Sequence, residues 1–117
     1  MALSPERLKL RPVRVRLPGM PPTHIRLQDG QRSTARLQTI SPTGGLLRVL
    51  KPLVPGVIAE LLFLTENGPV LALAELLNPY SDARIGLQPF RFLTMDQTDR
   101  DTLHAAIASS LAMAASH

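Results

Sequence analysis

Arginines dominate the beginning of the chain, in a spacing that suits an anionic ligand. Residues 1–36 hold eight basic and two acidic side chains, whereas residues 37–117 hold five basic and seven acidic ones. Arg7 and Arg11 lie four residues apart, directly ahead of an alternating apolar run at positions 12–17. One guanidinium can hold a phosphate, or the O6 and N7 acceptors of guanine, through two parallel hydrogen bonds. Two interpretations fit these residues: an anion-binding arm, or a solvated basic tail without a fixed partner.

A second group of small and polar residues lies in the segment 39–45. Thr39 and Ser41 offer hydroxyl groups, and that of Ser41 can bond a phosphate or guanine, or simply cap a turn. Gly44 and Gly45 permit a positive φ and the close approach of a ligand to the backbone. The alternative is a plain turn between two strands.

The arginine spacing occurs a second time, at Arg32 and Arg36. Arg36 precedes Thr39 by three residues on one predicted strand, and side chains alternate along a strand. We therefore expect Arg36 and Thr39 to point to opposite faces, and assign Arg32 and Arg36 to a solvated strand face.

Residue types that support catalysis or metal binding are sparse. There is no Cys, and His24, His104 and His117 are scattered along the chain. Because no His-x-x-x-His pair or carboxylate cluster is present, we expect neither an enzyme nor a metal site. Nucleic-acid binding is not favoured either, since one Tyr and three Phe are the only rings that could stack on bases.

Length and composition predict one folded domain. The chain has 117 residues, 44% of them hydrophobic, enough for a single modest core. The first residues lack the apolar stretch of a secretory signal. The apolar runs at 57–64 and 70–77 each contain a Glu and are too short to span a bilayer. We therefore expect a cytoplasmic domain without membrane insertion.

The periodicity of apolar residues predicts the elements that position these groups. An alternating run at 12–17 and further apolar runs at 24–27, 32–40, 45–50, 57–64, 70–77 and 85–93 indicate strands, with hairpin turns at Asp29-Gly30 and Asn67-Gly68. Leu103, Ile107 and Leu111 then form a helical stripe, with Thr94 or Asp96 as its N-cap. This order predicts a small antiparallel barrel followed by one helix, although a split sandwich fits the same pattern.

The two motifs together resemble the paired signature of the PilZ domain family. In that family Arg-x-x-x-Arg comes first and Asp/Asn-x-Ser-x-x-Gly follows one hairpin later. Here the first is residues 7–11 and the second is residues 39–44, with Thr39 at the Asp/Asn position. The run 86–92 resembles the family's late Gly-hydrophobic-x-Phe strand, so the resemblance extends from Arg7 to about Leu111.

The resemblance implies a mainly β fold, a six-stranded antiparallel barrel with a C-terminal helix. It implies a basic arm at residues 1–11 and one domain at 12–117. It also implies a bacterial sensor that binds cyclic di-GMP and relays that state to a protein partner, as a monomer or a weak homodimer. The ligand-binding residues would be Arg7, Arg11, Thr39, Ser41, Gly44 and Gly45. The alternative is an adaptor of pilus or motility machinery that binds no nucleotide and acts through protein contacts.

Overall fold

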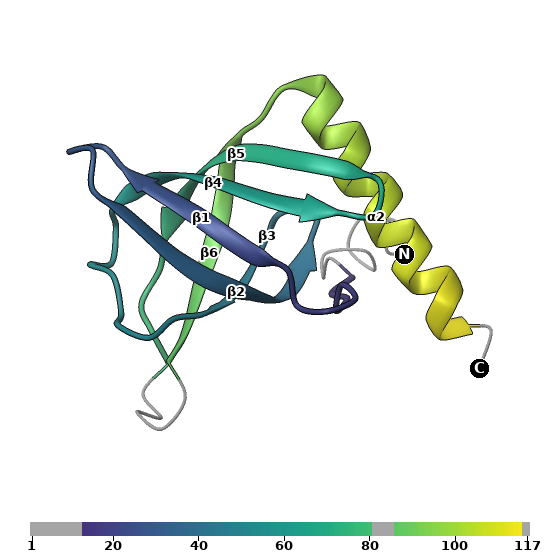
Figure 1. Cartoon of the computed structure of the whole chain (residues 1–117), viewed down its shortest axis with the longest axis horizontal. Coiled ribbons are helices and arrows are strands. Elements are labelled where there is room, and N and C mark those ends of the chain that lie inside the picture. Colours follow the sequence, from purple (N-terminus) through teal and green to yellow (C-terminus); the bar gives the residue numbers. More distant parts are fainter. Residues whose placement is uncertain (1–12, 81–85, 116–117) are drawn as a thin grey trace, which may run out of the picture.

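Six strands close into a barrel, and one helix follows them (Figure 1). The computed structural model describes residues 13–80 and 86–115. The strands are β1 (Pro22–Leu27), β2 (Arg32–Ser41), β3 (Gly44–Arg48), β4 (Ile58–Thr65), β5 (Gly68–Leu76) and β6 (Leu87–Thr94). Every neighbouring pair is antiparallel, and the order around the barrel is β1-β2-β3-β6-β5-β4. The predicted mainly β barrel with a C-terminal helix is therefore confirmed, and the split sandwich is excluded.

Alternation of side chains builds the barrel wall. In β4 and β5, every second side chain is buried, and the buried ones fill the interior. The predicted turns join neighbouring strands, with Gly30 at φ 88° and Gly68 at φ 126°, which a side chain rarely adopts. Gln88 is fully buried at the barrel wall. Its amide accepts from the N–H of Leu53 at 2.8 Å and donates to the Leu53 and Leu77 carbonyls at 2.7 and 3.1 Å.

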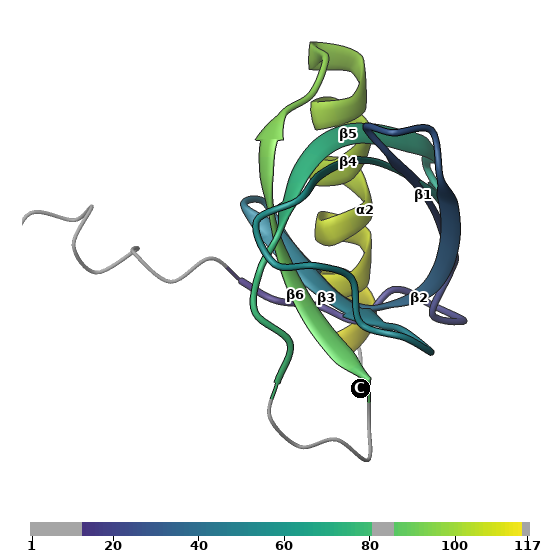
Figure 2. The same cartoon turned by 90° about the vertical axis from the view of Figure 1, so that its left-hand side faces the viewer.

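Helix α2 (Gln97–Ala115) lies across one opening of the barrel, as the end-on view shows (Figure 2). Asp96 begins it, because the Asp96 carbonyl accepts the N–H of Arg100 at 2.9 Å. Leu103 and Ile107 are buried in the core, as the helical stripe predicts. The expectation for Leu111 is wrong: this side chain is 41% exposed. The contacts of α2 with the barrel are mainly with β5, and its core residues are Leu103, Ala106 and Ile107.

The segment before β1 is not the strand that the pattern predicts. Val15 forms an isolated antiparallel bridge with Ile40, and its N–H and carbonyl both bond to Ile40 at 2.9 Å. Val15 and Leu17 are buried, whereas Val13 is 51% exposed. We call residues 13–17 the docked segment. It pairs with the part of β2 that follows Arg36, the last β2 residue that pairs with β1.

A bulge interrupts β2 beside the docked segment. Leu37 pairs with Leu47 of β3, but the next pair is Thr39 with Leu46, so Gln38 is an extra residue. An extra residue shifts the alternation of all later side chains by one position. Leu37 and Ile40, three residues apart, are therefore both buried in the core.

Candidate functional site

The hydroxyl of Ser41 caps the turn between β2 and β3. Its Oγ donates to the carbonyl of Gly44 at 3.1 Å and accepts the N–H of Thr43 at 3.3 Å. The Oγ also lies 3.3 Å from the hydroxyl oxygen of Thr43. Ser41 is buried, and its hydroxyl proton is engaged within the turn. Of the two roles predicted for the Ser41 hydroxyl, the ligand-free protein shows the capping of a turn.

Gly44 and Gly45 are required by strand packing. Neither has a positive φ, so that expectation is wrong. A Cβ on Gly44 would collide with the Phe90 carbonyl oxygen and lie 2.9 Å from the Cα of Arg91. A Cβ on Gly45 would lie 2.5 Å from the Thr39 carbonyl oxygen and 2.9 Å from the Phe90 ring. The close approach that these glycines permit is that of β6 and β2.

Thr39 holds an unsatisfied hydroxyl at this place. Its Oγ1 is buried and has no hydrogen-bond partner, and the same holds for Oε1 of the bulged Gln38. A buried polar atom without a partner is uncommon in a folded protein and marks a strained or functional position. Both atoms are acceptors for which the described residues supply no donor.

The docked segment brings further arginines to Thr39. Val15 faces the core, so its neighbours Arg14 and Arg16 face outward, and both are exposed. In the antiparallel register of the Val15–Ile40 bridge, Arg16 lies beside Thr39. The predicted ligand residues Arg7 and Arg11 lie outside the described residues.

Two arginines on the strands themselves were missed by the sequence argument. Arg36 was assigned to the face opposite Thr39, which is wrong, because the bulge at Gln38 returns both side chains to the outer face. Arg36 is the direct cross-strand partner of Arg48, and both are exposed. The signals for Arg36 in the sequence are the arginine bias of the first third and the second Arg-x-x-x-Arg spacing at Arg32 and Arg36.

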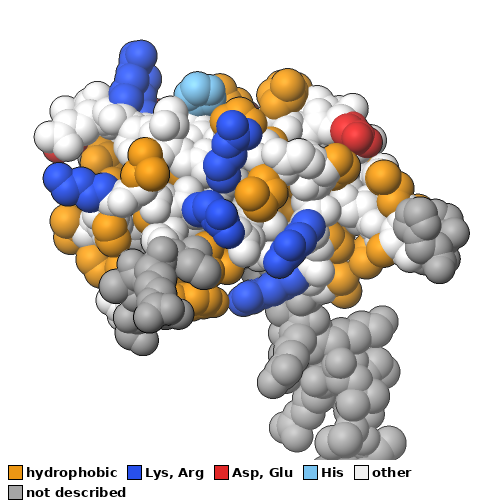
Figure 3. Space-filling view, turned by 60° about the horizontal axis from the view of Figure 1, so that its bottom comes forward, with side chains coloured by type: hydrophobic (Ala, Val, Ile, Leu, Met, Phe, Trp, Pro, Cys, Tyr) orange, Lys and Arg blue, Asp and Glu red, His pale blue; other side chains and the backbone are white. Residues whose placement is uncertain are grey.

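The outer face around β2 is accordingly basic. Figure 3 shows Lys and Arg side chains stretching across the face that includes β2. Within residues 13–80 and 86–115, the ion pairs are Arg26–Glu60 at 3.1 Å and Arg91–Glu75 at 2.6 Å. Neither Arg36 nor Arg48 therefore forms an ion pair with a carboxylate in this part of the chain. The excess of positive charge makes this face attract anions.

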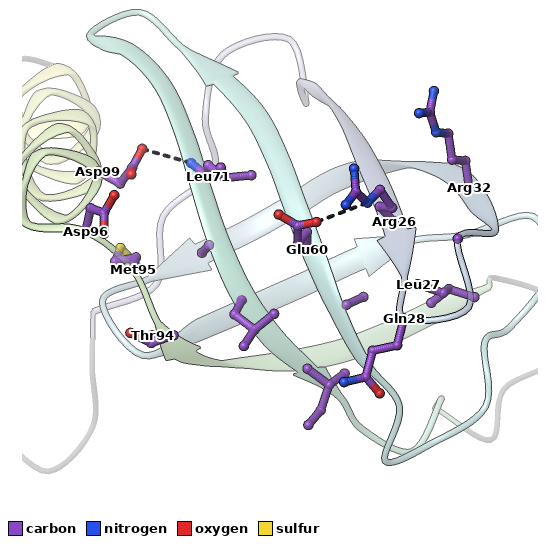
Figure 4. A pocket seen from close by; sticks show the side chains of 15 residues that line it. Arg26, Leu27, Gln28, Arg32, Glu60, Leu71, Thr94, Met95, Asp96 and Asp99 are labelled. Carbon is purple, nitrogen blue, oxygen red and sulfur yellow. Dashed lines mark hydrogen bonds and ion pairs between the residues drawn. The ribbon is translucent and has the colours of Figure 1, made fainter.

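A separate hollow of about 570 Å³ lies over β1, β4 and β5, beside the start of α2 (Figure 4). Three of its five charged side chains engage partners: Arg26 pairs with Glu60, and the Asp99 carboxylate accepts the N–H of Leu71 at 3.0 Å. Because three carboxylates and two arginines line it, this hollow suits a dianionic ligand less well than the face around Thr39.

The part of the chain that the structure describes contains neither a metal-binding group of side chains nor a membrane-spanning helix. No three His, Cys, Asp or Glu side chains gather there in an arrangement that would hold a metal ion. Nor does α2 have the apolar length that crossing a bilayer requires.

Comparison with known proteins finds similarity at the level of structure. No protein-family model matches the chain, and no curated protein matches it either. Solved structures do match. The PilZ domain of YcgR from Escherichia coli, determined with c-di-GMP, has a TM-score of 0.71 at 21% identity, covering 89% of this chain and 92% of that one.

Two longer proteins match over part of their length. YcgR from Escherichia coli in complex with c-di-GMP has a TM-score of 0.76 at 22% identity over 91% of this chain. The inhibitor of motility MotI from Bacillus subtilis has a TM-score of 0.66 at 14% identity over 86%. The chain spans 47% and 51% of these two proteins, about half of their length. The barrel and helix described above therefore have the fold of a PilZ domain.

Proposed function

We propose that the chain is a cytoplasmic bacterial PilZ-type domain that binds cyclic di-GMP on the outer face of β2 and β3. One observation carries the proposal: the docked segment, which follows the predicted arginine arm, pairs with β2 at Ile40 through Val15. Ile40 lies between Thr39 and Ser41 in the chain. This pairing supports the proposal that the arginine motif at residues 7–11 and the motif at residues 39–44 contribute to one site. The related structures of YcgR, determined with c-di-GMP, support the same ligand.

Chain length allows Arg11 and Arg7 to reach this site. They precede Val15 by four and eight residues, so their Cα atoms lie within about 14 and 28 Å of it. We propose that these arginines, in the arm formed by residues 1–11, hold phosphate and guanine groups of the ligand.

Thr39 and Ser41 form the opposite wall of the proposed site. Thr39 Oγ1 is buried without a partner, so a ligand reaches it only after neighbouring side chains move. In the complex this hydroxyl gains the partner that it lacks, from the N1–H or N2–H₂ donors of guanine. Gly44 and Gly45 contribute by shaping the turn, since their Cβ positions are already filled by β6 and β2.

Calorimetric titration with cyclic di-GMP tests the proposal, together with the shift of the melting temperature. Arg7→Ala and Arg11→Ala each remove a charge-assisted contact and should weaken binding by about 1.5–3 kcal/mol. Arg100→Ala is a matched control, because Arg100 lies on α2, away from Thr39. Wild-type binding that is unaffected by both arm substitutions would contradict the assignment of the arm.

A second candidate function belongs to another class: an adaptor that acts through protein contacts alone. The outer face of β4 and β5 favours it, because Leu62, Leu64 and Leu71 are 40%, 65% and 44% exposed there. Leu62 and Leu71 are cross-strand partners, so they form one continuous apolar surface on which a partner protein could bind. The adaptor replaces the sensor if neither wild type nor Thr39→Asn binds cyclic di-GMP at high concentration.

A further inference from the structure

We propose that Arg36 and Arg48 form a phosphate clamp for the nucleotide, on the strands rather than on the arm. The inference rests on the proposed function and adds two residues to its site. They belong to neither half of the two-part motif, and they come from different strands, β2 and β3.

The register places the two guanidinium groups together. Arg36 and Arg48 are direct cross-strand partners, and side chains in such pairs start about 5 Å apart on the same face. Leu46, the partner of Thr39, precedes Arg48 by two residues on β3, which is about 7 Å. The pair therefore lies within the reach of one nucleotide that also contacts Thr39.

The charges of this pair are uncompensated. Like charges that face each other directly across two strands destabilise a sheet. The comparable pair Arg26 and Arg32 differs, because Glu60 lies 3.1 Å from Arg26 and neutralises it. No described carboxylate does this for Arg36 or Arg48. A bound phosphodiester would supply the missing negative charge and accept hydrogen bonds from both guanidinium groups.

Arg36 also connects the clamp to the turn between the docked segment and β1. Its Nη1 donates to the carbonyl of Met20 at 3.3 Å, which leaves its other N–H groups available. Met20 has φ 43° and follows Gly19 at φ 74°, so the turn that leads from the docked segment to β1 contains two successive left-handed residues. Among the residues that the structure describes, the Arg48 side chain has no such contact, which makes it the cleaner residue for a test.

The experiment is calorimetric titration of cyclic di-GMP into Arg48→Gln, Arg36→Gln and the control Arg32→Gln. Arg32 lies on the same strand and face as Arg36, about 13 Å away, and its loss removes the same charge. We expect Arg48→Gln and Arg36→Gln to weaken binding by about 10- to 100-fold, and Arg32→Gln to leave it within about twofold. The decrease in affinity between about 0.01 M and about 0.15 M ionic strength should also be smaller in Arg48→Gln.

Stability without ligand separates a clamp from a structural role. Because Arg48→Gln removes a like-charge contact, the melting temperature of the ligand-free protein should rise by about 1–5 °C. A fall in melting temperature together with the loss of affinity would overturn the clamp. Wild-type affinity in Arg48→Gln would also overturn the clamp. This holds even if Arg36→Gln weakens binding, because Arg36 would then act only through its contact with Met20. If wild type itself does not bind, the proposed function fails and the clamp fails with it.

Discussion

Replacing Thr39 by Val should stabilise the protein while weakening its ligand binding. Thr39 Oγ1 is buried without a hydrogen-bond partner, and such a group lowers the free energy of unfolding by about 1–3 kcal/mol. Valine has nearly the same shape and suits a strand, so the substitution removes the hydroxyl and little else. We therefore expect the free energy of unfolding to rise by about 1 kcal/mol or more, and the melting temperature to rise by about 4 °C for each kcal/mol.

Thr23 provides a matched control within the same barrel. Its Oγ1 is also buried without a partner, but Thr23 is fully buried in β1, away from the face that carries Thr39 and Arg36. Thr23→Val should raise stability in the same way and leave cyclic di-GMP affinity unchanged.

Urea denaturation and calorimetric titration on the two variants provide the measurements. Thr39→Val should show a higher urea midpoint with an unchanged slope, and weaker binding of the nucleotide. A loss of 1 kcal/mol or more in Thr39→Val would mean that the hydroxyl has a partner in the ligand-free protein, and the reasoning about position 39 would be refuted. Equal affinity in wild type and Thr39→Val would remove Thr39 from the site.

Three further predictions follow from the same region. Thr39→Asn should tighten cyclic di-GMP binding, by about tenfold for each 1.4 kcal/mol recovered in calorimetry, because the amide oxygen accepts from guanine donors; weaker binding would mean that Thr39 makes a different contact. Gly45→Ala should lower the free energy of unfolding by about 1–3 kcal/mol in urea, since its Cβ would lie 2.5 Å from the Thr39 carbonyl oxygen; unchanged stability would contradict the packing role. Deleting residues 1–9 should abolish binding and leave the urea midpoint unchanged, because Val15 and Leu17 keep the docked segment on the core; a large fall in the midpoint would show that these residues are packed structure.

The pattern of the sequence determined the strands, the helix and most of their limits, whereas it left a barrel and a split sandwich open. Apolar runs marked β4 and β5 as strands, every second side chain of each is buried, and Asn67-Gly68 makes the turn between them. These features are local, because a strand or a helix carries its period in consecutive residues. The family resemblance, based on two short motifs, likewise led to the fold that the solved structures share.

Only the tertiary structure decided which side chains share the outer face near Thr39. Alternation alone assigned Arg36 and Thr39 to opposite faces, but the extra residue Gln38 exists only in the pairing of β2 with β3. Gly44 and Gly45 suggested space for a ligand, whereas β6 and β2 occupy that space. The pairing of Arg36 with Arg48 joins residues twelve positions apart, so its unbalanced charge depends on strand register. Contacts of this kind are set by strand pairing and register, and no period in the chain encodes them.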